Sequence, residues 1–276
     1  MKILVTGAGG QLGHYLQKQI LQNEEFEEIE LIACTSDDLD ITQLPQVMSV
    51  LNERKPEVVI NAAAYTQVDL AEDEPELAML VNATAVSNLA EVCSSIDAKL
   101  VQVSTDYVFD GTNTDGYHVN DQTNPINIYG KTKLAGEQYA LAYAQGYVVR
   151  TSWVYSEFGR NFANTMRRLF KDREEIAIVN DQIGCPTHAN NLAHYLLKQS
   201  LEKKWGQKSQ PPSQRIYHYT DGDIMSWYEL ALKLYKEEQQ KLALKNEVVN
   251  LNCQITATSS ESYPTKAKRP QYSILK

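Results

Sequence analysis

Tyr129 and Lys133 place a phenol and an ammonium group four residues apart within residues 124–137, NPINIYGKTKLAGE. The second half of this segment favours a helix, so the two side chains lie one turn apart on the same face. A neighbouring positive charge stabilises a phenolate, which predicts a lowered pKa for Tyr129 and proton transfer near neutral pH. Tyr272 and Lys276 repeat the spacing, so a half-buried tyrosine beside a solvated lysine remains the alternative.

A glycine turn near the start of the chain has a pattern that binds dinucleotides. The apolar, β-branched residues 2–6 lead directly into GAGGQLG, and a helical pattern follows. A strand, a glycine turn and a helix in this order present backbone N–H groups and the helix dipole to a pyrophosphate. A tight turn without a ligand is the alternative. The predicted cofactor contacts in this turn are Gly7, Gly10, Gln11, Leu12 and Gly13.

The second strand of such a fold lies beside the adenosine ribose, and residues 29–34 fit that strand. Its tip, residues 34–36, reads Cys-Thr-Ser and is neutral. An acid at the tip favours NAD and an arginine favours NADP, so the sequence leaves NADH and NADPH both open. We expect Asp40 and Ile41 to border the adenine.

Small and hydroxyl-bearing side chains follow the next two expected strands. Residues 56–64 form an apolar run whose end, Ala62, Ala63 and Ala64, suits close passage of a cofactor, with plain core packing as the alternative. Residues 99–103 form another strand, followed by Ser104 and Thr105. The carboxyl ends of parallel strands meet at one rim, where ligands of such sheets bind. The glycine turn, the hydroxyl pair and the Tyr/Lys pair therefore converge there.

These patterns predict an α/β protein with a Rossmann-type, doubly wound parallel sheet and a smaller, mostly C-terminal substrate-binding lobe. We expect an NAD(P)-binding domain over residues 1–155 and the substrate lobe over 156–276, with possible chain exchange between the two. Residues 203–214 are expected to form an exposed loop. Further expected helices cover residues 44–53, 76–94, 189–201 and 227–244, and further strands residues 146–155 and 216–219.

Composition excludes several classes of function. The net charge of -9 over 276 residues argues against nucleic acid or an anionic membrane as a partner. The four cysteines lie far apart without metal-ligand spacing, so reduced core thiols and no metal site are expected. No stretch reaches the roughly 20 apolar residues of a membrane span, and the first strand leaves no room for a signal peptide. A cytoplasmic protein is expected.

Collinear motifs along nearly the whole chain resemble the dTDP-4-dehydrorhamnose reductase family of the extended short-chain dehydrogenase/reductase superfamily. The strings STDYVFDG and FGRNF are more specific than the glycine motif. The motifs that carry the resemblance are Gly7-x-x-Gly10-x-x-Gly13, residues 61–69 (NAAAYTQVD), residues 104–111 (STDYVFDG), Tyr129-Gly-Lys-Thr-Lys133, residues 158–162 (FGRNF), residues 181–187 (DQIGCPT) and Arg269-Pro270.

The resemblance implies reduction of the C4 ketone of dTDP-4-dehydro-L-rhamnose by NADPH or NADH. It implies that Thr105, Tyr129 and Lys133 form the catalytic triad, with Tyr129 as proton donor. Thr105 would orient the ketone oxygen, while Lys133 would hold the nicotinamide ribose. Simple core packing remains an alternative for Trp153. Positions that match the sugar-nucleotide pocket of the family are Val68, Thr105, Asp106, Tyr107, Trp153, Asn161, Phe162, Gln182 and Thr187.

The sequence departs from the family in three places. Some members bind magnesium at a dimer interface through carboxylates, one of them in the first helix, where this chain has His14-Tyr15-Leu16. The chain also stops soon after Arg269-Pro270, and Val119 stands where relatives often have Glu. We therefore expect a monomer or a homodimer without a bridging metal, and one substrate contact fewer.

Two other functions remain open on sequence alone. A sugar-nucleotide epimerase, dehydratase or other 4-keto-sugar reductase would share the fold, but dehydratases place Asp-Glu after the threonine where this chain has Asp106-Tyr107. The regulatory subunit of methionine adenosyltransferase resembles the same reductases and is a binding protein. The complete Thr105, Tyr129 and Lys133 set favours an enzyme.

Overall fold

The computed structural model describes residues 1–202, 204–206, 210–244 and 251–276. Its largest sheet has six strands in the order β10-β5-β4-β3-β1-β2, and all neighbouring pairs are parallel. This order confirms the predicted α/β class. The strands are β1 (Lys2–Thr6), β2 (Glu30–Cys34), β3 (Val58–Asn61), β4 (Lys99–Thr105), β5 (Gly146–Thr151) and β10 (Ile216–His218).

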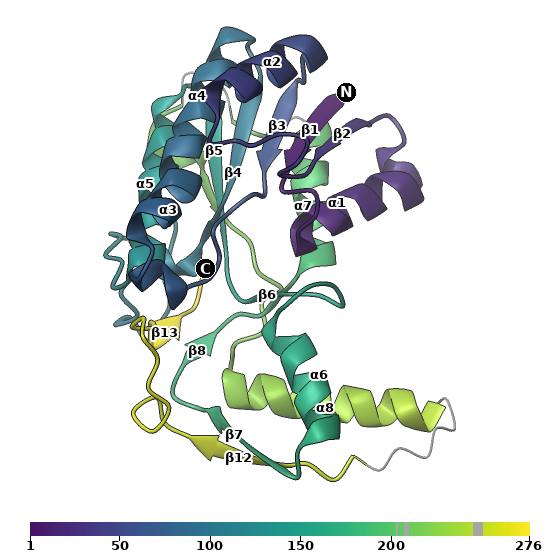
Figure 1. The fold of residues 1–276 in the computed structure, drawn as a ribbon, viewed down its shortest axis with the longest axis vertical. Helices are drawn as coiled ribbons and strands as arrows, with labels where there is room; N and C mark the ends of the chain where they lie inside the picture. The colour runs from purple at the N-terminus through teal and green to yellow at the C-terminus, as the bar shows by residue number, and fades with distance from the viewer. Residues whose placement is uncertain (203, 207–209, 245–250) are drawn as a thin grey trace.

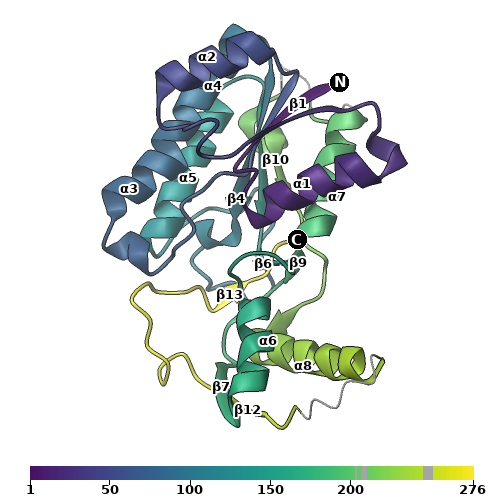
Figure 2. The ribbon, with the colours of Figure 1, turned by 45° about the vertical axis from the view of Figure 1, so that its right-hand side comes forward.

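Helices cover both faces of this sheet, as Figures 1 and 2 show. Side chains alternate between the faces along each strand, so Ile3 and Val5 pack with α1 and α7 while Leu4 packs with α2 and α4. Because both faces are covered, β3 and β5 are buried along their whole length. The helices are α1 (Gln11–Gln22) and α7 (Ala189–Leu201) on one face, and α2 (Leu44–Arg54), α4 (Ala85–Ser95) and α5 (Ile128–Ala142) on the other.

One helical run corrects an expectation about membranes. Helix α3 (Pro75–Met79), the π-helical turn η3 (Leu80–Thr84) and α4 together are long and apolar enough to span a bilayer by length and composition. The expectation that no stretch reaches that length was therefore wrong. Half of the run is buried, and α4 packs on α2, α5 and β4 with Val86 and Leu89 fully buried. Core packing accounts for its apolar composition.

A second, smaller set of elements lies beyond the carboxyl ends of the large sheet (Figure 1). Helices α6 and α8 pack on a parallel pair, β7 and β12, around an apolar core. The expected strand over residues 146–155 is split, because Trp153 has a positive φ of 47° that no strand accommodates. These elements are β6 (Val154–Tyr155), α6 (Phe162–Asp172), β7 (Glu175–Val179), β8 (Ile183–Gly184), β9 (Thr187–His188), β11 (Met225–Ser226), α8 (Trp227–Leu244), β12 (Gln254–Thr258) and β13 (Tyr272–Ser273).

The C-terminal segment, residues 266–276, returns from the small lobe to the large sheet. We call it the strap. The Ala267 N–H and the Arg269 guanidinium both bind the Asp69 carboxylate, and the carbonyl of Lys268 accepts from Asn127 at the start of α5. Strand β13 within the strap pairs with β8. Because α7, β10 and the strap all lie against the large sheet, we retain two domains with exchange between residues 1–155 and 156–276 as a proposal.

The expected exposed loop over residues 203–214 lies partly outside the described residues. Within the described part, Trp205 is only 3% exposed and packs on the rings of Tyr147 and Tyr217. Residues Pro212–Arg215 form a 3-10 helix whose Arg215 is buried. The expectation of an exposed loop is wrong for Trp205, whose ring packs beside β10, whereas residues 204 and 211–214 are exposed as expected.

Candidate active site

The glycine turn forms a cradle that only glycine permits. Gly7 has a φ of 66°, and a Cβ there would lie 2.7 Å from the Cα of Ala63. A Cβ on Gly13 would lie 2.3 Å from the carbonyl oxygen of Gly7. Helix α1 starts behind Gly10 without a side-chain cap, and the first N–H groups of a helix lack intrahelical acceptors. The chain therefore has the backbone donors and the close approach that fit the pyrophosphate of NAD(P)H.

The side chains of the predicted cofactor contacts differ in their surroundings. The Leu12 side chain is buried in the core, so Leu12 would contact a ligand through its backbone. Asp40 accepts hydrogen bonds from the N–H and hydroxyl of Thr42, and Ile41 is only 5% exposed. Residues 62–64 follow β3 and lie beside Gly7. A contact of Asp40 and Ile41 with adenine stays a prediction.

An acid lies at the tip of β2, where the sequence suggested neutral residues. Asp38 turns back, and its Oδ2 accepts hydrogen bonds from the Thr35 N–H at 2.9 Å and the Thr35 hydroxyl at 2.7 Å. These hydrogen bonds lower the pKa of the Asp38 carboxyl. Residues 34–36 are neutral as expected, but the prediction did not consider Asp38, which the turn brings back to the tip.

The structure brings Thr105, Tyr129 and Lys133 together at the carboxyl end of β4. Thr105 ends that strand and is 6% exposed. Tyr129 lies in the first turn of α5, which Asn127 caps by accepting from the Gly130 N–H at 2.7 Å. The Lys133 Nζ donates to the carbonyl of Val103 at 2.7 Å. The three side chains are therefore fixed by one strand and one helix.

The pKa of Tyr129 moves opposite to the expected direction. Burial raises it to about 12, the Thr105 hydroxyl opposes that rise, and the Asp106 carboxyl adds to it. Lys133 does not lower it, because the ammonium is turned to the backbone of β4. Burial lowers the pKa of Lys133 to about 8, against the charge of Glu137. Tyr129 therefore keeps its proton at neutral pH and is a proton donor rather than a base.

Thr105, Asp106 and Tyr107 form one polar cluster beside Tyr129. Thr105 Oγ1 lies 2.9 Å from Asp106 Oδ1 and accepts from the Tyr107 N–H at 3.2 Å. The rings of Tyr107 and Tyr129 meet edge to face with centroids 5.7 Å apart. A Cβ on Gly130 would lie 2.1 Å from the Tyr107 carbonyl oxygen, so glycine allows the helix to approach this cluster.

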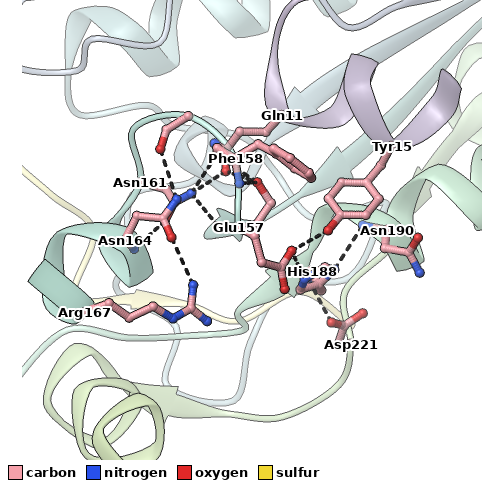
Figure 3. A network of polar contacts seen from close by, with 12 residues as sticks. Gln11, Tyr15, Glu157, Phe158, Asn161, Asn164, Arg167, His188, Asn190 and Asp221 are labelled. Atoms are coloured by element: carbon pink, nitrogen blue, oxygen red, sulfur yellow. Dashed lines mark hydrogen bonds and ion pairs between the residues drawn. The ribbon is translucent and has the colours of Figure 1, made fainter. Parts of the chain in front are cut away.

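A loop from the small lobe is fastened to the first turn of α1, as Figure 3 shows. Gln11 Oε1 accepts from Ser156 Oγ at 2.8 Å and from Asn161 Nδ2 at 2.7 Å. Asn161 also caps α6 by accepting from the Asn164 N–H at 2.8 Å. Tyr15 donates to Glu157 in the same loop. Asn161, predicted to contact substrate, thus connects the small lobe to the cofactor cradle.

Aromatic rings form a second cluster in the small lobe. Trp153 stacks face to face on Trp227, with ring centroids 3.5 Å apart and planes 4° apart. Phe162 packs on Trp227 at 4.6 Å, and the Trp227 Nε1–H donates to Gln182 Oε1 at 3.2 Å. The buried Thr187 joins through its N–H, which donates to the carbonyl of Trp153.

Val68 belongs to neither of these clusters. It lies in the turn after β3, beside Asp69, the carboxylate that the strap binds. Apart from Asn161, which lies in the loop bonded to Gln11, the other predicted substrate contacts are divided between the Tyr129 cluster and the Trp153 cluster.

Comparison with known proteins identifies the family. A family model described as the RmlD substrate binding domain matches residues 1–276. The chain belongs to this family. The dTDP-4-dehydrorhamnose reductase of Aggregatibacter actinomycetemcomitans is 39% identical over 282 residues, which cover 99% of this chain and 90% of that protein.

Two solved structures match this RmlD-family chain over its whole length. A dTDP-4-dehydrorhamnose reductase from Clostridium acetobutylicum ATCC 824 has a TM-score of 0.88 and 40% identity, and 90% of that chain is covered. The Bacillus anthracis str. Ames reductase in complex with NADP also has a TM-score of 0.88, with 37% identity and 90% of that chain covered. The resemblance drawn from the motifs is confirmed.

Sequence reasoning missed several residues that support the site of this RmlD-family protein. Glu137 continues the helix face of Tyr129 and Lys133, and it binds Arg150 through two pairs of atoms at 2.9 and 2.7 Å. Both side chains are at most 3% exposed. The arginine inside the apolar strand β5 could have indicated a buried ion pair. The aromatic first residue of α8, Trp227, was a weaker indication of a site residue.

Cysteine chemistry and metal binding receive little support from the structure. Cys34, Cys93, Cys185 and Cys253 are all buried and free, as expected. Among the described residues no group of three or more His, Cys, Asp or Glu side chains is arranged to hold a metal ion. Next to the first helix, the Glu157 carboxylate binds the hydroxyl of Tyr15 and the ring of His188.

Proposed function

We propose that this protein is a dTDP-4-dehydrorhamnose reductase, which reduces the C4 ketone of dTDP-4-dehydro-L-rhamnose to dTDP-L-rhamnose in dTDP-rhamnose biosynthesis. The observation that carries the proposal is the half-buried Tyr129 beside Thr105, on the rim where the glycine cradle of β1 also opens. The full-length similarity to reductases of this name supports the same substrate.

The proposal gives each residue of the triad a step that the geometry supports. When bound, NADPH or NADH supplies the hydride that reduces the ketone carbon. Tyr129, protonated at neutral pH, donates its proton to the ketone oxygen as negative charge develops there. Thr105 stabilises the phenolate left behind, and Lys133, whose ammonium is held by the Val103 carbonyl, binds the nicotinamide ribose of the cofactor. Burial strengthens these interactions because it excludes water.

We propose that the Trp153 cluster forms the wall of the sugar-nucleotide pocket. Flat aromatic faces contact the apolar faces of sugar and base rings, and the Gln182 amide adds a polar group beside them. We further propose that the protein acts in the cytoplasm as a monomer, or as a homodimer without a bridging metal.

The decisive experiment measures the loss of NADH or NADPH absorbance with enzymatically generated dTDP-4-dehydro-L-rhamnose. The Tyr129→Phe variant is expected to lose about 10²–10⁴-fold in kcat, because it lacks the proton donor. Tyr139→Phe is the matched control, since Tyr139 lies on the same helix and is 46% exposed. Absence of oxidation by the folded wild-type protein with either cofactor would overturn the proposal.

Cofactor preference depends on the acid at the tip of β2. The ionised Asp38 beside Thr35 repels the 2′-phosphate of NADPH and favours NADH. Asp38→Asn is expected to raise the ratio of kcat/KM for NADPH to that for NADH by roughly tenfold. Asp37→Asn, one residue away, serves as the control. An unchanged ratio in Asp38→Asn would show that Asp38 does not read the ribose.

A further inference from the structure

Asp106 is a buried carboxyl group next to the reacting centre with one oxygen left without a partner. It follows Thr105 directly and is only 2% exposed. Its Oδ1 lies 2.9 Å from the Thr105 hydroxyl oxygen, whereas its Oδ2 is buried and makes no hydrogen bond to any described residue. An ionised carboxylate in such a place loses hydration at both oxygens, and the nearby hydroxyls of Thr105 and Ser273 and the backbone N–H groups of residues 106 and 107 replace only part of it.

The protonation state of Asp106 decides where the single hydroxyl hydrogen of Thr105 points. The Tyr107 N–H already donates to Thr105 Oγ1. If Asp106 is a carboxylate, the Thr105 hydroxyl must donate to it and offers only a lone pair to Tyr129. If Asp106 is a neutral acid, it can donate to Thr105, whose hydrogen is then free to point at the Tyr129 oxygen.

We propose that Asp106 is a positioning residue that works as a neutral carboxylic acid, donates a hydrogen bond to Thr105 and thereby directs the Thr105 hydroxyl hydrogen at Tyr129. The inference rests on the proposed reductase function. Asp106 keeps its proton throughout. The proton that Tyr129 loses goes to the ketone oxygen, and the Thr105 hydrogen stabilises the phenolate that remains.

The surroundings of Asp106 favour the neutral form. Burial raises its pKa from 3.8 to about 7, and outweighs the hydroxyls of Ser273 and Thr105 and the backbone N–H groups of Asp106 and Tyr107, which lower it. The other titratable groups that face it are the phenols of Tyr107 and Tyr129 and the thiol of Cys185, and burial raises the pKa of each of them. These groups stay neutral near pH 7, so Asp106 is the group whose charge changes there.

The first test compares the pH dependence of kcat in the wild type and Asp106→Asn. The isosteric amide donates to Thr105 at every pH. Wild-type kcat should fall as pH rises through about 7, the pKa of Asp106. In Asp106→Asn the fall should begin about one pH unit higher, where Lys133 loses its charge at about 8. Asp110→Asn, in the same loop but with a lowered pKa, should keep the wild-type midpoint.

The outcomes separate two failures. A wild type without reductase activity contradicts the proposed function. An active wild type whose alkaline midpoint is unchanged in Asp106→Asn contradicts the role of Asp106.

A second test needs neither turnover nor a folded variant. Infrared spectra of wild-type protein with ¹³C-labelled aspartate should show a protonated carboxyl band at pH 6 that disappears with a midpoint near 7. Absence of this band at pH 6 would show an ionised Asp106 and overturn the inference. Where Asp106→Asn folds, its spectrum should lack the band.

Thermal unfolding gives a third readout with a defined sign. Between pH 3.8 and about 7 the folded protein keeps the Asp106 proton while the unfolded chain releases it. Folded-state proton binding then exceeds that of the unfolded state, so rising pH destabilises the wild type. As pH rises across this range, the Tm of the wild type should fall relative to that of Asp106→Asn. Above about pH 7 the difference between the two Tm values should stay constant. A difference that is constant from pH 3.8 to about 7 as well would contradict the inference.

Discussion

The Tyr129 cluster and the Trp153 cluster hold their side chains by different means. In the first, Lys133 is bonded to the backbone of β4, and Arg150 and Glu137 form a buried ion pair behind it. In the second, Trp153 sits at a positive φ between a six-residue and a two-residue strand, held against Trp227 by ring stacking. The groups proposed to transfer a proton are thus fixed by long elements, while the proposed pocket wall depends on mutual packing of side chains.

The largest expected effect comes from breaking the ion pair behind the Tyr129 cluster. Arg150→Met leaves the buried Glu137 charge without its partner, so the free energy of unfolding should fall by about 3–5 kcal/mol. Urea denaturation measures this change. Lys171→Met breaks a pair to Glu238 whose lysine is 48% exposed, and about 1 kcal/mol or less is expected. Equal losses in both variants would contradict the difference between buried and surface pairs.

The stacking of the Trp153 cluster is tested by Trp227→Leu. Loss of the stack should let Trp153 relax from its positive φ and raise the KM for the sugar nucleotide about tenfold, with kcat nearly unchanged. The near-ultraviolet circular dichroism of the stacked pair should disappear as well. Trp205→Phe changes the buried tryptophan of the large domain and should leave KM as it is. A fall in kcat without a change in KM would place Trp227 in the chemistry instead.

The smallest effect is expected where the strap binds Asp69, between the small lobe and the large sheet. Arg269→Met removes a partly exposed pair with Asp69, and a loss of about 0.2–1 kcal/mol is expected. Because the hydrogen bond from Arg269 lowers the pKa of Asp69, the stabilisation is present above pH 3.8 and lost as pH falls below it. Wild type and variant should therefore differ in Tm at pH 6 and converge in acid. Divergence in acid would contradict this assignment.

Long periodic segments were predictable from the sequence. The expected bounds of β1, α7 and α8 agree with the structure, because their apolar spacing matches one period throughout. The family motifs also identified most residues of both clusters. What failed depended on tertiary contacts. Burial raises the pKa of Tyr129, and Lys133 has a backbone acceptor on β4; no helix pattern specifies either of these features.

Other differences from the prediction have two origins. Asp38 reaches the tip of β2 only because Thr35 donates to it twice. Trp153 breaks its expected strand because its ring is placed against Trp227, 74 residues later in the chain. Trp205 looked like part of a polar loop, yet its indole fills space beside Tyr147. The outcomes at Trp153 and Trp205 are decided by partners that are distant in sequence, whereas Asp38 is placed by a local turn with Thr35.

The strap implies that cofactor binding and catalysis arise at different times during protein synthesis. The glycine cradle is built from residues near the start of the chain and from residues 62–64. The start of α5, by contrast, is bonded to Lys268, and Ser273 faces Asp106. A nascent chain can therefore form the nucleotide cradle before residues 266–276 have been synthesised. We expect the catalytic centre to be completed only once residues 266–276 have left the ribosome, so a shorter nascent chain could hold cofactor without consuming it.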